Sequence, residues 1–204
     1  MEATAVSTTS SSQRRVKLAS RAALGLFAVL SLTVVGVISW NVVFNGAIWT
    51  GAVGYVFDSM QYLAWVREGA DHFLAGNLFQ LEPPVRNYLN PGLIISSGLS
   101  KLGLSIPLAY AFWIPVGIAL LIWVVRKFVS WLELSGWTSV AVITLALLYK
   151  FPIATLLKGH VPEVNVNALT YGGTDAWPVY WSWGFSLTAV SVALLCLGVM
   201  RYDA

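Results

Sequence analysis

LSIPLAYAFWIPVGIALLIWVV, residues 104–125, is the stretch that decides the fold, because it is long, strongly apolar and free of charged residues. A hydrocarbon core about 30 Å thick needs about 20 consecutive apolar residues to be crossed by a helix. Since backbone polar groups find no partner in lipid, such a run is expected to be helical. Comparable runs occur at 22–44, 136–157 and 179–200. The sequence therefore predicts an all-α fold with four transmembrane helices.

The composition of the whole chain agrees with a membrane protein. Hydrophobic residues make up 57% of the 204 residues, charged residues only 10%, and the mean hydropathy is +0.73. Soluble domains carry about 25% charged residues, so this composition argues against an ordinary soluble enzyme. The net charge of +3 comes from basic residues at the borders of the apolar runs, so no nucleic-acid partner is expected. The single Cys196 excludes an intrachain disulfide and a cysteine-based zinc site.

The basic residues predict the orientation in the membrane. They lie before the first run, between the second and third, and after the fourth: Arg14, Arg15, Lys17, Arg21, Arg126, Lys127 and Arg201. Because positive charge is retained on the cytoplasmic side, we expect a multi-pass protein of the plasma membrane with both termini in the cytoplasm. Loops 45–103 and 158–178 then face outward. Residues 1–20, which begin with a Ser, Thr and Ala-rich segment, are expected to be a disordered cytoplasmic N-terminus before a transmembrane domain at 21–204.

The first outer loop is expected to contain two short interfacial helices. One is predicted at 58–74, with Asp58 as its N-cap and apolar residues at helical spacing. It is too polar to span, and amphipathic helices of this kind lie in the membrane interface. The second is predicted to begin after Asn90 as N-cap, with Pro91 at the first helical position, and to end at Gly103.

Asp58 is the first candidate for chemistry, because it follows the first apolar run near the expected membrane surface. A carboxylate there could take a proton from an acceptor hydroxyl, or hold a divalent cation against a phosphate. Its sequence context equally supports a plain helix N-cap. No other metal site or cofactor is predicted. His160 and Glu163 are three residues apart, but Pro162 separates them and no second histidine lies nearby in the sequence.

Four further residues are candidates for binding a substrate. Lys150 is the one charged residue within the four predicted spans, where an ionisable group suggests function. It could pair with a lipid-linked phosphate, or extend its ammonium group to the interface. Arg67 and Arg86 could bind phosphate bidentately, or be solvated loop charges. Tyr62 is an aromatic neighbour of Asp58.

Three stretches resemble polytopic bacterial membrane proteins, an actinobacterial group related in architecture to the GT-C glycosyltransferases. They are DSMQYLAWVREGADHFLAGNLF at 58–79, NYLNPGLIISSGLSKLGLSIPLAYAFWIPVGIALL at 87–121 and WSWGFSLTAVSVALLCLGVMRYD at 181–203. The resemblance implies a transferase that moves a sugar from a polyprenyl-phosphate donor to an extracytoplasmic hydroxyl. In GT-C enzymes an acidic residue of the first outer loop acts as base or metal contact, and Asp58 matches that position. Tyr62, Arg67, Arg86 and Lys150 are then the substrate-binding candidates.

GT-C proteins usually have many more than four spans. We therefore expect this chain to be a fragment of such an enzyme, a truncated product, or a subunit that needs further membrane partners. The alternative hypothesis is a non-enzymatic accessory or assembly subunit, in which Asp58 only caps its helix. A small transporter is disfavoured, because the spans show no paired pattern of broken helices.

Overall fold

A computed structural model of the chain describes residues 3–51, 56–76, 85–148, 178–179, 181 and 186–202, with the side chains of 3–10 and 56–59 excepted. These residues form helices and connecting segments, and none of them belongs to a β-strand. The helices are α1 (Ala3–Phe44), α2 (Val56–His72), α3 (Pro91–Lys101), α4 (Ile106–Ala111), α5 (Trp113–Trp131), α6 (Gly136–Leu148) and α10 (Ser186–Tyr202).

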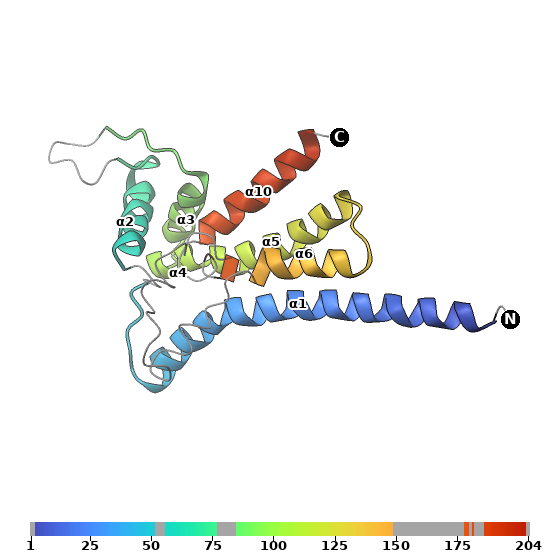
Figure 1. The fold of residues 1–204 in the computed structure, drawn as a ribbon. Coiled ribbons are helices and arrows are strands. Elements are labelled where there is room, and N and C mark those ends of the chain that lie inside the picture. Colours follow the sequence, from blue (N-terminus) through green and yellow to red (C-terminus); the bar gives the residue numbers. More distant parts are fainter. Residues whose placement is uncertain are drawn as a thin grey trace, which may run out of the picture.

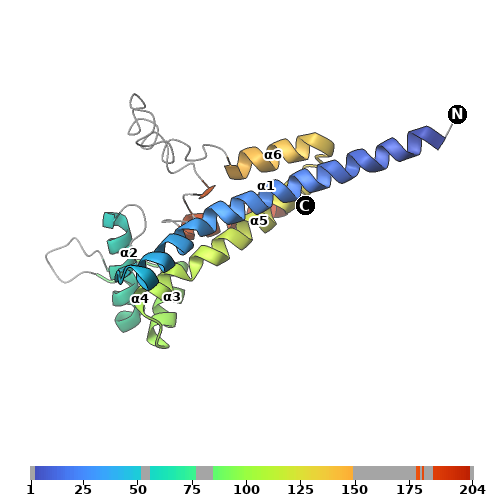
Figure 2. The same cartoon turned by 90° about the horizontal axis from the view of Figure 1, so that it is seen from below.

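The long helices run roughly side by side, and the short ones gather at one end of them. α1 lies along α6, and α10 lies along α5 (Figures 1 and 2). α2, α3 and α4 pack together beyond the carboxyl-terminal end of α1, at Phe44 (Figure 1). The N-terminus, the α5–α6 connection and the C-terminus lie toward the other end. The described part of the molecule therefore has two distinct ends.

Two helical segments are long and apolar enough to cross a membrane, which indicates a membrane protein. They are Ser11–Phe44, with 34 residues, and Ile106–Trp131, with 26 residues. α6 and α10 have 13 and 17 residues, fewer than the roughly 20 that a span needs. Two of the four predicted spans thus coincide with helices that could cross a membrane, and the prediction of four spans stays a prediction. Residues 149–157 of the third lie outside the described residues.

α1 differs from the sequence-based expectation at its beginning. A disordered segment was expected over 1–20, but the helix already includes Ala3. The sequence from Ala3 to Leu24 contains neither glycine nor proline. Because extending a nucleated helix costs far less than starting one, the apolar run can propagate its helix back through this segment. At 1.5 Å per residue the 42 residues of α1 are on the order of 60 Å long, about twice the thickness of a hydrocarbon core.

Within the second predicted span the helical hydrogen bonding is irregular at Phe112, between α4 and α5, but Phe112 keeps helical backbone angles and the segment runs on to Trp131. Pro115 has no backbone N–H to donate to the carbonyl of Ala111, so the ladder of helical hydrogen bonds is broken there. At its other end the helix continues past the predicted limit of Val125 as far as Trp131.

α5 ends in a Schellman motif. The Leu134 N–H donates to the carbonyl of Val129 (3.3 Å), and the Glu133 N–H donates to that of Ser130 (3.1 Å). Glu133 has a φ of 55°, the left-handed conformation that this motif requires.

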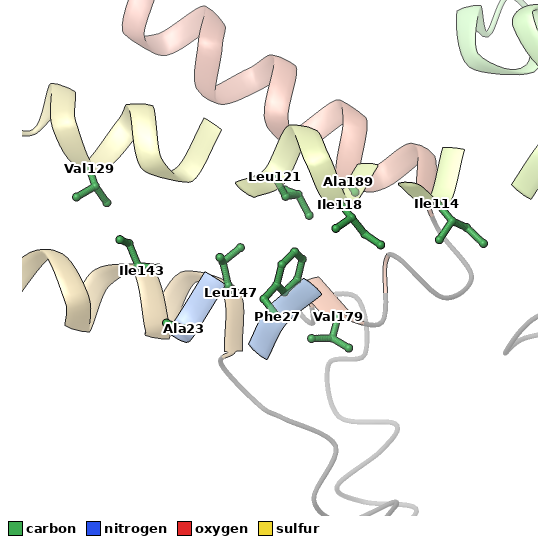
Figure 3. Packing of buried hydrophobic residues seen from close by; sticks show 10 residues of the cluster. All are labelled: Ala23, Phe27, Ile114, Ile118, Leu121, Val129, Ile143, Leu147, Val179 and Ala189. Carbon is green, nitrogen blue, oxygen red and sulfur yellow. The ribbon is translucent and has the colours of Figure 1, made fainter. Parts of the chain in front are cut away.

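The main hydrophobic core lies where α1, α5 and α6 meet. Phe27 of α1 is completely buried, and Leu147 of α6 is 1% exposed. Figure 3 shows both side chains beneath Leu121 and Ile118 of α5. The other core members in that view are Ala23, Ile114, Val129, Ile143, Val179 and Ala189. Burying a large aliphatic or aromatic side chain contributes about 1.5–3 kcal/mol in water, although lipid reduces this term for a spanning helix.

α10 is held against α5 by close backbone packing. A Cβ atom at Gly117 of α5 would lie 3.1 Å from the Cβ of Ala189 and 3.2 Å from the carbonyl oxygen of Ser186. Small residues at such crossings let membrane helices approach closely. Farther along, Val124, Ala193 and Met200 form a second buried cluster between the two helices. The pair therefore packs along most of α10.

Candidate functional site

The candidate site lies in the juxtamembrane unit, by which we mean α2, α3, α4 and the connecting residues 73–76 and 85–90. Its own small core consists of Leu63 and Val66 of α2, Leu93 of α3 and Tyr110 of α4. Val66 is completely buried and Leu93 is 3% exposed. The unit is therefore a packed structure that is continuous with the membrane helix α5 through α4.

α2 and α3 approach each other at Gly69 and Ser97. The Ser97 Oγ lies 2.9 Å from the Val66 carbonyl oxygen and 2.8 Å from that of Leu93, so its one proton can be donated to either acceptor. A Cβ at Gly69 would lie 2.5 Å from this Oγ, closer than real atoms come. Glycine at this position is thus required by the close packing of the two helices.

A second serine joins α3 to the membrane helix. The indole Nε1–H of Trp113, at the start of α5, donates to the Ser96 Oγ at 2.9 Å, and both side chains are buried. A buried hydrogen bond of this kind contributes about 0.5–1.5 kcal/mol, and leaving either partner unsatisfied costs more. Ser96 and Ser97 therefore connect α3 to two different neighbours, α5 and α2.

The chain after α2 folds back onto that helix. The Gly76 N–H donates to the Glu68 Oε2 at 3.1 Å, and the Trp65 Nε1–H donates to the Gly76 carbonyl at 3.1 Å. The Arg86 Nε lies 3.3 Å from the other oxygen of Glu68. The Trp65 ring is 4.7 Å from that of Tyr88, centre to centre. These contacts hold both ends of the connection between α2 and α3 against α2.

The predicted ends of α3 are confirmed. The Asn90 Oδ1 accepts hydrogen bonds from the N–H groups of Gly92 (3.0 Å) and Leu93 (3.3 Å), and Pro91 is the first helical residue. Gly103, at φ 106°, follows the C-cap Leu102. Local sequence signals therefore define this helix fully.

The predicted ends of α2 are wrong by about two residues. The helix begins at Val56, so Asp58 belongs to its first turn and is not the N-cap. It ends at His72, because Phe73 turns into the left-handed region at φ 66°. The side chain of Asp58 lies outside the described part, so its roles as base or cation ligand stay predictions.

The remaining candidates do not converge on one point. Tyr62 follows Asp58 by four residues, so both lie on the same face of α2. Its ring stacks on that of Tyr110 at 5.8 Å with an interplanar angle of 12°. Arg67 is exposed and lies nine residues after Asp58, which at 100° per residue places it on the opposite face of the helix. Arg86 is paired with Glu68, and Lys150 lies outside the described residues.

The space between α2 and α3 is too small for a sugar. The cleft beside Trp65, Gly69 and Tyr88 has a volume of about 10 Å³, no more than one water molecule needs. In the described ranges of the chain, no group of three or more His, Cys, Asp or Glu side chains is placed to hold a metal ion. Any substrate would therefore have to bind outside this cleft.

Sequence reasoning did not identify Glu68, Ser96 and Ser97, which bind the parts of the juxtamembrane unit together. A signal for the serines was present, because they are adjacent small polar residues inside the apolar run 93–102. No comparable local signal distinguishes Glu68 from the other charged residues of α2.

Comparison with known protein families, with curated proteins and with solved structures finds no match for this chain.

Proposed function

We propose that this chain is a four-span protein of the plasma membrane that forms all or part of a GT-C-like transferase. It would move a sugar from a polyprenyl-phosphate donor to an extracytoplasmic hydroxyl. Asp58 would act there as the base or the ligand of a divalent cation.

The distribution of charge supports the orientation in this proposal. The start of α1, the last turns of α5 and the end of α10 carry most of the basic residues, and all lie toward one end of the molecule (Figure 1). The juxtamembrane unit lies at the other end. Because basic residues favour the cytoplasmic side, the juxtamembrane unit belongs on the outer face. That is the side on which this class of transferase would meet its substrates.

The observation that carries the proposal is the place of Asp58 in the fold. It belongs to the first turn of α2, which begins soon after the membrane helix α1 ends at Phe44. Tyr62, one turn farther along the same face, stacks on Tyr110, whose helix α4 leads directly into α5. The face of α2 that carries Asp58 therefore packs, through Tyr62, against the residues that lead into α5. A carboxylate carried at that boundary would meet both a lipid-linked phosphate and a hydroxyl in water.

The basic residues proposed to bind phosphate differ in their surroundings. Arg86 already neutralises Glu68, so it could bind a phosphate only by giving up that ion pair. Arg67 is on the face of α2 opposite Asp58 and would serve a different site. Lys150 lies outside the described residues and stays our proposed contact for the donor phosphate, together with Tyr62, which shares a face of α2 with Asp58.

The second candidate function is a non-enzymatic accessory or assembly subunit. It is favoured by the bonds of Glu68, which hold the connection between α2 and α3 closed, and by the absence of substrate-sized space in the cleft beside Trp65. In this alternative the juxtamembrane unit is a rigid surface for another membrane protein, and Asp58 contributes only to the start of its helix.

The test is sugar transfer by membranes that contain the whole chain and its natural partners. Labelled sugar on polyprenyl phosphate is the donor, and incorporation into acceptor is measured with Asp58→Asn in place of the native residue. Asp71→Asn, an exposed carboxylate of the same helix, is the matched control. We expect Asp58→Asn to reduce transfer by at least about 100-fold, as loss of a general base does, and Asp71→Asn to leave it unchanged. Equal transfer in both variants would favour the accessory subunit.

A further inference from the structure

A shallow groove runs along the exposed face of the carboxyl-terminal part of α10, beside Trp131 at the end of α5 and away from the juxtamembrane unit. It has a volume of about 640 Å³, and its lining residues are Trp131, Leu194, Leu195, Gly198, Val199 and Tyr202. That volume falls within the roughly 300–1,000 Å³ of small-molecule sites in proteins. The lining side chains are almost wholly apolar, so the groove suits a hydrocarbon chain.

Gly198 forms an open part of this groove. A Cβ atom built there would meet nothing within 4 Å. The helices are nevertheless in contact beneath it, since Val124 of α5 and Ala193 and Met200 of α10 are buried against each other. The groove is therefore a hollow on the surface of a packed helix pair, and the missing side chain at Gly198 enlarges it.

Helical spacing places two cations near the groove, although neither is one of its lining residues. Arg201 follows Gly198 by three residues, so it lies on the same side of α10. Lys127 precedes Trp131 by four residues on α5, and its Nζ lies 5.2 Å from the centre of the Trp123 ring. Both side chains are exposed, and the one ion pair among the described residues joins Arg86 and Glu68 elsewhere. An apolar groove with exposed positive charge nearby suits a ligand that is apolar along its length and anionic at one end.

We propose that this groove binds an anionic phospholipid of the leaflet on the basic side of the membrane. One acyl chain lies along the exposed face of α10 beside Trp131, and the phosphate is held by Arg201 and Lys127. Basic residues between membrane helices on the cytoplasmic side are a recognised setting for anionic headgroups. The site is distinct from the proposed transferase site, which is at the opposite end of the molecule, and does not depend on it.

The charges favour a lipid over a second copy of the chain. Two copies related by a two-fold axis along the membrane normal would place their Arg201 residues at the same depth and close together. Like charges brought together at an interface are unfavourable, whereas a phosphate neutralises them. The phospholipid is therefore the occupant that satisfies both the apolar lining and the cations.

The experiment measures lipid retained by the full chain in a neutral detergent, by native mass spectrometry. Phosphatidylglycerol and phosphatidylcholine with identical acyl chains are titrated separately. We expect phosphatidylglycerol to be retained more strongly, and Arg201→Gln and Lys127→Gln each to weaken its binding about fivefold without changing that of phosphatidylcholine. If Arg201 and Lys127 only stabilise the ends of their own helices, replacing them would change the binding of neither lipid.

The groove itself is tested by Gly198→Leu, which fills it with a side chain that also favours the helix. Gly25→Leu on α1 is the control, because a Cβ there also meets nothing within 4 Å. Gly198→Leu is expected to lose retention of both lipids, and Gly25→Leu to behave as the native chain. Equal retention of the two lipids by the native chain would overturn the proposal. It would also be overturned if Gly198→Leu still bound phosphatidylglycerol, or if lipid-free dimers formed that this substitution abolished.

Discussion

Gly69→Ala is expected to loosen the contact between α2 and α3. The added methyl group would lie 2.5 Å from the Oγ of Ser97 and 3.3 Å from its Cβ. Neither distance leaves room for a methyl group, so α3 must move away or Ser97 must rotate. Rotation would take the Ser97 hydroxyl from its 2.9 Å contact with the carbonyl of Val66. Either response weakens the juxtamembrane unit.

The magnitude follows from two opposing contributions. Replacing glycine by alanine inside a helix stabilises it by about 1 kcal/mol. Forcing an extra carbon into a packed interface costs about 1–3 kcal/mol. The net effect of Gly69→Ala is then a loss of up to about 2 kcal/mol in the free energy of opening the unit. Gly98→Ala on α3 has the same helical gain without the clash, since its Cβ meets nothing within 4 Å.

Hydrogen exchange of the backbone amides in α2 and α3 is the assay, because it measures the free energy of local opening. The two variants should differ by about 1–3 kcal/mol, which is roughly 5- to 150-fold in protection. Combining Gly69→Ala with Ser97→Ala should recover part of the loss, because the closest clashing atom is removed. Equal protection in Gly69→Ala and Gly98→Ala would refute the close packing of α2 on α3.

Substitutions at two further residues test the connection between α2 and α3 by the same exchange measurement. Asn90→Ala removes the N-cap of α3 and should cost about 1 kcal/mol, while Asn90→Asp should retain most of the cap; equal losses would contradict the capping role. Glu68→Gln should cost less than about 1 kcal/mol, and less at high salt, because Arg86 is 43% exposed. Glu68→Ala should cost about 1–3 kcal/mol, since the buried Gly76 N–H then loses its acceptor; similar costs for both variants would show that this hydrogen bond contributes little.

Sequence reasoning worked best where the signals are local. The ends of α3 follow from Asn90, Pro91 and Gly103, each of which acts on its own backbone or on that of its nearest neighbours. The first two long apolar runs are helical, as expected of segments long enough to cross a membrane, where backbone groups find no other partner. The irregularity at Phe112 was visible in principle, since Pro115 stands three residues later.

Sequence reasoning failed where the structure of a segment depends on tertiary contacts or on an unfavourable local conformation. Phe73 ends α2 in the left-handed region, which a bulky residue rarely adopts, and nothing in its own identity predicts this. The stacking of Tyr62 on Tyr110 and the pairing of Glu68 with Arg86 join residues far apart in the sequence. They can be found only once the chain has folded back on α2. For that reason the sequence, which left Arg86 as either a phosphate contact or a solvated loop charge, showed no sign of its ion pair with Glu68.

The proposed function requires the juxtamembrane unit and the α5–α6 connection to lie on opposite sides of the membrane. The direct measurement is labelling of single cysteines in intact cells with a membrane-impermeant maleimide, after Cys196→Ala removes the native thiol. Ala64→Cys on α2 and Ser135→Cys before α6 are at exposed positions. We predict that Ala64→Cys is labelled in intact cells and Ser135→Cys only after permeabilisation. Labelling of both in intact cells, or of Ser135→Cys alone, would contradict the proposed topology.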